Sequence, residues 1–258
     1  MAFQPLSTRL ATVIALCCSA TAMPALSAQL IQNGGFESGF SSWTRVDQVG
    51  SEGTFTIQTG LLSPVNGDST PEPTEGDFAA MTDAYGSGSH VLYQDFLVSS
   101  ANGFLSFDLF IGNRAPQFAT PPGGSLAFDL TSQLGANTLN QQARVDIVKA
   151  SAEPFSVDSS DVLLNLFATA DGDSLISGYT SYSFNLDSVF SAYLGQTLRL
   201  RFAETDNILP FQFGVDNVSL DTSVTVPEPG SIALLGLGLV AFWYGCNFQP
   251  KKKDNSNT

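Results

Sequence analysis

The sequence predicts an all-β protein, an antiparallel β-sandwich with an N-terminal signal helix and a single C-terminal transmembrane helix outside it. In the middle of the chain, apolar and polar side chains alternate at every second residue, which is typical of half-buried strands. Clusters of Gly, Pro, Asn and Asp separate these short runs, as expected for the turns of a sandwich. Two longer apolar stretches flank the alternating region, one near each end.

The first 28 residues are predicted to be a secretory signal peptide. Arg9 supplies a weak positive charge, a short apolar stretch follows, and small residues lead up to Ala28. This order favours cleavage by signal peptidase between Ala28 and Gln29. The alternative is an uncleaved N-terminal anchor, for which the apolar run is short.

Residues 29–223 form the predicted β-domain. Leu198, Leu200 and Phe202 alternate with Arg199 and Arg201, so the apolar and basic side chains should lie on opposite faces of one strand. By the same pattern we expect strands at Thr54–Thr59, Phe78–Thr82, Val91–Val98, Gly103–Ile111, Ala143–Ala150, Tyr179–Leu186, Thr197–Glu204 and Phe211–Leu220.

One short helical turn is expected within Leu186–Gly195. Asp187 or Ser188 would cap its start, and Gly195 would end it. Elsewhere in the domain, Ser69–Gly76 is predicted to be a solvated loop and Asp171–Ser174 an acidic turn.

The predicted domain is strongly acidic. From residue 29 to residue 226 there are 22 Asp and Glu side chains against six Lys and Arg, a net charge of −16. Nucleic acid and anionic lipid bind cationic patches, so we expect no nucleic-acid partner, whereas divalent cations and neutral sugars are compatible with this charge. The domain has no cysteine and can therefore form no disulfide.

Catalytic motifs are absent from the predicted domain. Its one histidine, His90, follows a Gly-Ser-rich turn and is expected to be solvated. No serine lies in a Gly-x-Ser-x-Gly elbow, no histidine pair offers a zinc site, and no glycine-rich loop suits a phosphate. We therefore predict that the protein is not an enzyme, with a glycoside hydrolase that uses paired carboxylates left open.

The C-terminal region has three parts. Residues 224–230 contain Pro227, Glu228 and Pro229, which should form an extended linker because proline disfavours helix at and before its position. Residues 231–250 carry no charge and are just long enough for a transmembrane helix. Residues 251–258 begin with Lys251, Lys252 and Lys253, which should stay cytoplasmic by the positive-inside rule.

This three-part C-terminus resembles that of the PEP-CTERM proteins of Gram-negative bacteria. It departs from their usual pattern in having lysines where arginines are commoner, and in its short polar tail. The resemblance implies recognition by an exosortase after transient single-pass anchoring in the inner membrane. The exported domain would then reach the cell surface or the extracellular matrix. The alternative is an ordinary C-terminal membrane anchor with a proline-rich stalk.

A second resemblance covers the β-domain. The stretches Asn33–Trp43, Leu194–Phe202 and Gly214–Ser219 are similar to the opening and closing segments of galactose-binding-like jelly rolls, the fold of many carbohydrate-binding modules. The resemblance implies a jelly-roll β-sandwich whose first and last strands lie side by side.

In such relatives this strand pairing often holds a structural calcium ion. Glu37 and Asp216 are the matching carboxylates here, with backbone carbonyls near Asn33–Gly35 as further ligands. Calcium prefers such a mixture of carboxylate and carbonyl oxygens. The alternative is that both carboxylates accept hydrogen bonds from backbone amides at turns.

The aromatic residues do not indicate a sugar site. Aromatic side chains at alternating strand positions are usually part of the core, and Trp43 is predicted to point inward. We expect a non-enzymatic exported surface or matrix protein associated with extracellular polysaccharide or biofilm, the ligand-binding residues being unknown. The alternative function is a secreted carbohydrate-active protein that binds or hydrolyses glycans.

Overall fold

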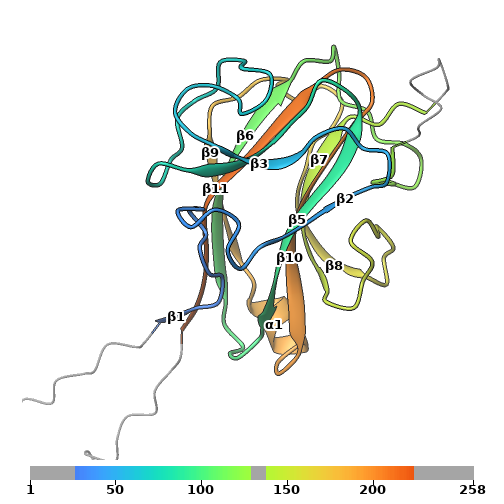
Figure 1. Cartoon of the computed structure of the whole chain (residues 1–258). Coiled ribbons are helices and arrows are strands. Elements are labelled where there is room, and N and C mark those ends of the chain that lie inside the picture. The colour runs from blue at the N-terminus through green and yellow to red at the C-terminus, as the bar shows by residue number, and fades with distance from the viewer. Residues whose placement is uncertain (1–26, 129–137, 224–258) are drawn as a thin grey trace, which may run out of the picture.

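The computed structural model describes residues 27–128 and 138–223, which form an all-β jelly-roll sandwich of two antiparallel sheets (Figure 1). The predicted linker 224–230, transmembrane helix 231–250 and basic tail 251–258 lie outside the described residues, as does nearly all of the signal peptide 1–28. Within the described ranges, no helix has the length and apolar character needed to cross a membrane.

The first sheet has the strand order β3-β4-β11-β6-β9, and β1 also pairs with β11. The bounds of its strands are β1 Ser27–Gln29, β3 Thr54–Gln58, β4 Ala79–Asp83, β6 Phe104–Asn113, β9 Thr180–Asn185 and β11 Phe211–Ser223.

The second sheet has the order β2-β5-β10-β7-β8, and the helix α1 (Asp187–Ala192) joins β9 to β10. Its strands are β2 Thr44–Asp47, β5 Gly88–Leu97, β7 Gln142–Lys149, β8 Val162–Ala168 and β10 Thr197–Asp206.

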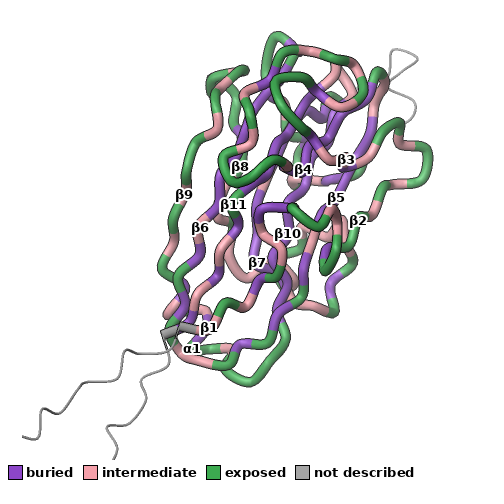
Figure 2. The backbone as a smooth tube through the Cα atoms, turned by 60° about the vertical axis from the view of Figure 1, so that its left-hand side comes forward, coloured by how far each residue is buried: buried purple, intermediate pink, exposed green. Residues whose placement is uncertain are grey.

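The core lies between the two sheets, as alternation predicts. Leu198, Leu200 and Phe202 of β10 are fully or almost fully buried. Phe107 of β6 meets Phe202 edge-on across the sandwich, with 5.4 Å between the ring centroids. Figure 2 shows buried backbone along the inner strands, while the connecting loops and β9 are largely exposed. Trp43 is 7 % exposed, which confirms the inward orientation predicted for it.

All eight predicted strand runs are strands in the structure, with small differences at their ends. The sequence pattern missed β1, β2 and β8. The first two are short, and β8 (Val162–Ala168) is nearly continuous in apolar residues, so no alternation marks it.

The predicted helical turn is present as α1, but its cap is different. Leu186 occupies the N-cap position, and no side chain caps the helix. Asp187 lies in the first turn, where its carboxylate accepts a hydrogen bond from the Gly103 amide at 3.0 Å. Asp187 therefore binds the residue that precedes β6 and does not cap the helix. Gly195 follows the helix with a φ of 80°, as its predicted role at the end requires.

The first and last strands lie side by side, as the jelly-roll resemblance implies. In β1, Ala28 pairs with Thr222 and Gln29 with Asp221 of β11, and the Leu30 amide donates to the Leu220 carbonyl at 2.8 Å. The chain therefore enters and leaves the sandwich at one end, which is also the end where α1 lies (Figures 1 and 2). The predicted cleavage position between Ala28 and Gln29 falls within β1.

Candidate functional site

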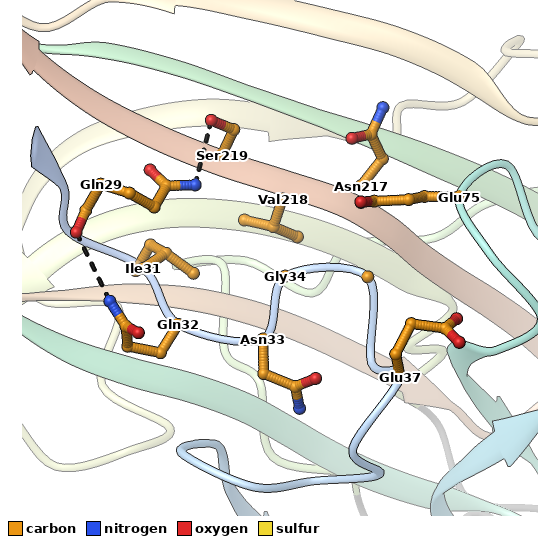
Figure 3. A pocket seen from close by; sticks show the side chains of 11 residues that line it. Gln29, Ile31, Gln32, Asn33, Gly34, Glu37, Glu75, Asn217, Val218 and Ser219 are labelled. Carbon is orange, nitrogen blue, oxygen red and sulfur yellow. Dashed lines mark hydrogen bonds between the residues drawn. The ribbon is translucent and has the colours of Figure 1, made fainter. Parts of the chain in front are cut away.

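The segment after β1 and strand β11 enclose a polar hollow of about 470 Å³. Gly34 is held against β11, since the Val218 amide donates to the Gly34 carbonyl at 3.1 Å. A Cβ atom at Gly34 would lie 1.8 Å from the Val218 carbonyl oxygen, so only glycine allows this approach. Figure 3 shows side chains of both segments, together with Glu75, around the hollow. Its lining residues are Gln29, Ile31, Gln32, Asn33, Gly34, Gly35, Glu37, Glu75, Asn217, Val218 and Ser219.

Asp216 of β11, one predicted calcium ligand, is fully buried and does not line this hollow. Its Oδ2 atom accepts hydrogen bonds from the Thr74 amide at 2.6 Å, the Thr74 hydroxyl at 3.0 Å and the Glu75 amide at 3.0 Å. Its Oδ1 atom accepts one from the Asn217 amide at 2.7 Å. Burial raises the pKa of Asp216, and these hydrogen bonds oppose the rise.

Glu37, the other predicted calcium ligand, binds the next part of the same loop. Its Oε1 atom accepts hydrogen bonds from the amides of Asp77 at 2.8 Å and Phe78 at 3.0 Å. The structure thus brings Glu37 and Asp216 onto one loop, residues 74–78, through backbone N–H groups. The Ser69–Gly76 stretch is mostly exposed as predicted, but these bonds anchor its end.

Asp108 of β6 belongs to the same cluster and was not singled out from the sequence. It is the cross-strand partner of Asp216, and the Thr74 hydroxyl donates to its Oδ2 atom at 2.7 Å. The Asn217 side-chain amide donates to the same oxygen at 3.2 Å. Alternation along Gly103–Ile111 places Asp108 on the outer face, but the register that sets it opposite Asp216 is not encoded in that pattern.

The fit of this cluster to calcium is incomplete. Most hydrogen-bond donors to Glu37 and Asp216 are backbone N–H groups, which a cation would have to replace. Across residues 27–128 and 138–223, no three His, Cys, Asp or Glu side chains are grouped as a metal site. Oxygen ligands are nevertheless concentrated here, because Glu37, Glu75 and the Asn33–Gly35 backbone line one hollow.

His90 is not the solvated turn residue that we expected. It lies in β5 with 2 % of its surface exposed, and its Nδ1 atom is 2.7 Å from Asp47 Oδ1. The expectation failed because β5 begins at Gly88, inside the apparent turn, and the alternation of β5 then directs His90 inward with Leu92.

Glu204 lies directly across from His90 in β10 and is also buried. Its Oε1 atom has no hydrogen-bond partner among the residues that the structure describes. Burial and the nearby charge of Asp206 raise the pKa of Glu204 well above its ordinary value. Burial likewise raises the pKa of Asp206 to about 7, against hydrogen bonds from backbone amides. A carboxyl group in this setting is stable in its neutral form.

Arg199 and Arg201 lie on the outer face of the second sheet, as alternation predicts, yet both are buried. Arg201 donates to Asp146 Oδ2 at 2.6 Å and to the carbonyls of Pro154 and Ser156. Arg199 donates to Asp95 and to the carbonyls of Ala150 and Ala152. The two guanidinium groups hold residues 150–156 over the sheet, so this face is covered by the chain itself.

The acidic stretch Asp171–Ser174 is a turn, as predicted. The Asp173 amide donates to the Ala170 carbonyl at 3.1 Å, and Asp173 Oδ2 accepts from the Ala170 amide at 2.8 Å. Gly172 has a φ of 93°, which glycine adopts readily.

Comparison with protein families identifies the C-terminal region. The PEP-CTERM protein-sorting motif matches residues 225–246. The chain carries a PEP-CTERM sorting signal. The matched span includes Pro227, Glu228 and Pro229 and ends before Lys251. A chain with this signal is an exported protein that is sorted through an exosortase.

The chain is also similar to several solved structures. They include the carbohydrate-binding module TmCBM61 in complex with β-1,4-galactotriose, at 11% identity and a TM-score of 0.42, covering 75% of this chain and 97% of that one. The K3 cleaved adhesin domain of Lys-gingipain from Porphyromonas gingivalis W83 has 14% identity and a TM-score of 0.45, with 76% and 100% covered. The Stig cyclase Fisc from Fischerella has 18% identity and a TM-score of 0.41, with 76% and 98% covered. No curated protein matches the chain.

Proposed function

We propose that this PEP-CTERM protein is a non-enzymatic component of the cell surface or extracellular matrix that associates with exopolysaccharide or biofilm. The observation that carries the proposal is the sorting motif at residues 225–246. The net charge of −16 between residues 29 and 226 adds to it, because such a surface repels polyanions and is compatible with neutral polysaccharide.

In this proposal, the chain is processed near both of its termini. Signal peptidase cleaves between Ala28 and Gln29, and the transmembrane helix 231–250 then holds the protein briefly in the inner membrane of a Gram-negative bacterium. Lys251, Lys252 and Lys253 stay on the cytoplasmic side until an exosortase acts near Pro227–Pro229. Ala28 and Thr222 are paired in adjacent strands, so both processing sites adjoin the same end of the domain.

Fractionation of producing cells with and without their exosortase tests the sorting part. With the exosortase, the protein should be recovered from the surface or the matrix. Without it, the protein should stay in the inner-membrane fraction. Equal distribution in the two strains would contradict the proposal.

Incubation of the mature protein with extracellular polysaccharides tests the non-enzymatic part. Co-sedimentation without new reducing ends is the expected result. Release of reducing ends would instead support the alternative, a secreted glycoside hydrolase.

Calcium at Glu37 and Asp216 is a separate proposal. The cation would replace amide hydrogen bonds to loop 74–78 and would neutralise the facing carboxylates Asp108 and Asp216. Melting of the domain in calcium and in chelator tests it. A lower melting temperature in chelator is expected, and equal temperatures would contradict calcium binding.

A further inference from the structure

The two sheets part along the edge where β8 and β9 lie, and a cleft of about 410 Å³ opens between them. Phe167 from β8 and Tyr182 from β9 form part of its wall, from opposite sheets. Asp173, Ser174 and Ser177 of the connecting loop add polar groups, as does Thr180 of β9. This volume is near the lower end of the roughly 300–1,000 Å³ typical of small-molecule sites.

The aromatic wall is both fixed in place and accessible. Phe167 and Tyr182 meet edge to face with their ring centroids 5.2 Å apart, and Tyr182 also stacks on the buried Phe107 at 5.9 Å. Phe167 and Tyr182 are only half-buried, whereas Phe107 is 1 % exposed. Rings held rigidly by the core offer apolar contact area at little cost in conformational entropy.

The polar groups of the cleft are only partly engaged: Asp173 Oδ2 accepts from the Ala170 amide at 2.8 Å, and the Thr180 hydroxyl donates to the Gly178 carbonyl at 3.5 Å. Asp173, Ser174 and Thr180 are exposed, and within residues 27–128 and 138–223 the hydroxyls of Ser174 and Tyr182 have no hydrogen bond. Tyr182 and Asp173 line the same cleft, and the pKa of Tyr182 is raised, first by burial and then by the charge of Asp173. None of the described lining residues is Lys or Arg.

Other broad surfaces of the sandwich are covered by the chain. Arg199 and Arg201 hold residues 150–156 over the second sheet, and Asp216 holds loop 74–78 over the first. The β8/β9 edge differs from these surfaces, because its cleft is lined by residues of both sheets and opens between them.

We propose that the β8/β9 cleft binds a neutral saccharide, with the sugar ring against Phe167 and Tyr182 and its hydroxyls on Asp173, Ser174 and Thr180. The inference rests on the polysaccharide association proposed above and names its site. A sugar presents an apolar C–H face and a rim of hydroxyls, which suits aromatic rings bordered by carboxylate and hydroxyl groups. An anionic ligand would meet Asp173 without any cation to pair with it.

Binding of the mature protein to a panel of neutral polysaccharides, by affinity electrophoresis, tests the proposal. Asp173→Asn removes the negative charge and Tyr182→Phe removes the hydroxyl, while the loop and the ring are preserved. Each should weaken binding by roughly tenfold, because a hydrogen bond to a charged group or a desolvated hydroxyl is worth about this much. Asp171→Asn, two residues away and outside the cleft, and Tyr85→Phe on another exposed loop are the matched controls and should bind like the wild type.

The possible outcomes separate the site from the function. If the wild type binds and Asp173→Asn and Tyr182→Phe bind equally well, the cleft is not the site, although polysaccharide association stands. If the wild type binds no neutral polysaccharide, or only a cationic probe such as choline, the saccharide site and the polysaccharide association both fail. Melting temperatures close to the wild-type value will show that the variants remain folded.

Discussion

At the scale of single residues, buried carboxyl groups make the stability of the domain depend on pH. Glu204 and Asp206 lie between the sheets, and the pKa of each is raised. A carboxyl group that holds its proton more tightly when folded adds stability at low pH. That stability is complete below the unfolded pKa, near 4, and is lost as the pH rises through the folded value, about 7 for Asp206.

The wild-type domain should therefore melt at a higher temperature at pH 5 than at pH 8. Glu204→Gln mimics the neutral acid, so it should reduce this difference mainly by raising the melting temperature at pH 8. Differential scanning calorimetry at both pH values measures it. Glu72→Gln, on an exposed loop, serves as the control and should keep the wild-type difference. An unchanged pH dependence in Glu204→Gln would rule out a neutral Glu204.

Gly34 allows the segment after β1 to pack closely against β11. Because a Cβ atom there would overlap the Val218 backbone, Gly34→Ala should push the first segment away from β11. We expect a loss of about 1–3 kcal/mol in the free energy of unfolding, as for other overpacked positions. Urea denaturation of Gly34→Ala beside Gly178→Ala, where a Cβ meets nothing within 4 Å, gives the comparison. Equal stability of the two variants would disprove the close approach.

At the scale of elements, residues 150–156 cover the outer face of the second sheet, and a buried ion-pair network holds them there. Asp146 of β7 is fully buried and binds Arg201 and Arg144 together. Asp146→Asn would leave the buried Arg201 without a counter-charge. The expected cost is about 3–5 kcal/mol, together with faster proteolytic cleavage within residues 150–156.

Asp68→Asn is the matched control for Asp146→Asn. Asp68 pairs with Arg114 at 3.1 Å, and both side chains are more than a third exposed. Its loss should cost about 0–1 kcal/mol because water screens such a pair. Equal losses of stability in the two variants would show that the ion pair at Asp146 does not hold residues 150–156 over the sheet.

The alternation of apolar and polar residues predicted some strands and missed others. Alternation correctly predicted the orientation of β10, where Leu198 and Phe202 face the core. Alternation failed for β8, whose side chains are mostly half-buried on both faces. It also failed for His90, because the glycine- and serine-rich residues before it look like a turn although β5 already begins at Gly88. Local pattern reports which side a residue faces but not what covers that side.

The candidate sites were harder to predict for the same reason. Glu37 and Asp216 were predicted as calcium ligands, and in the structure both accept hydrogen bonds from backbone amides of loop 74–78. Asp108 was missed because its role depends on the register of β6 against β11. The β8/β9 cleft was missed because Phe167 and Tyr182 come from different sheets, and only the packing of those sheets places them together.

At the scale of the whole molecule, the sandwich and the sorting signal are joined at one end. Gln29 pairs with Asp221, so the strands that begin and close the domain are neighbours. Strand β9, which borders the cleft, is separated from β11 by β6. The domain can thus be held near its β1/β11 end while this cleft stays open to the surroundings.

The central claim is that the protein is exported and processed through its C-terminal signal. Mass spectrometry of the mature protein recovered from producing cells tests this most directly. The account predicts a chain that begins at Gln29 and ends near Pro227–Gly230. A chain that still extends to Thr258 in the surface or matrix fraction would contradict it.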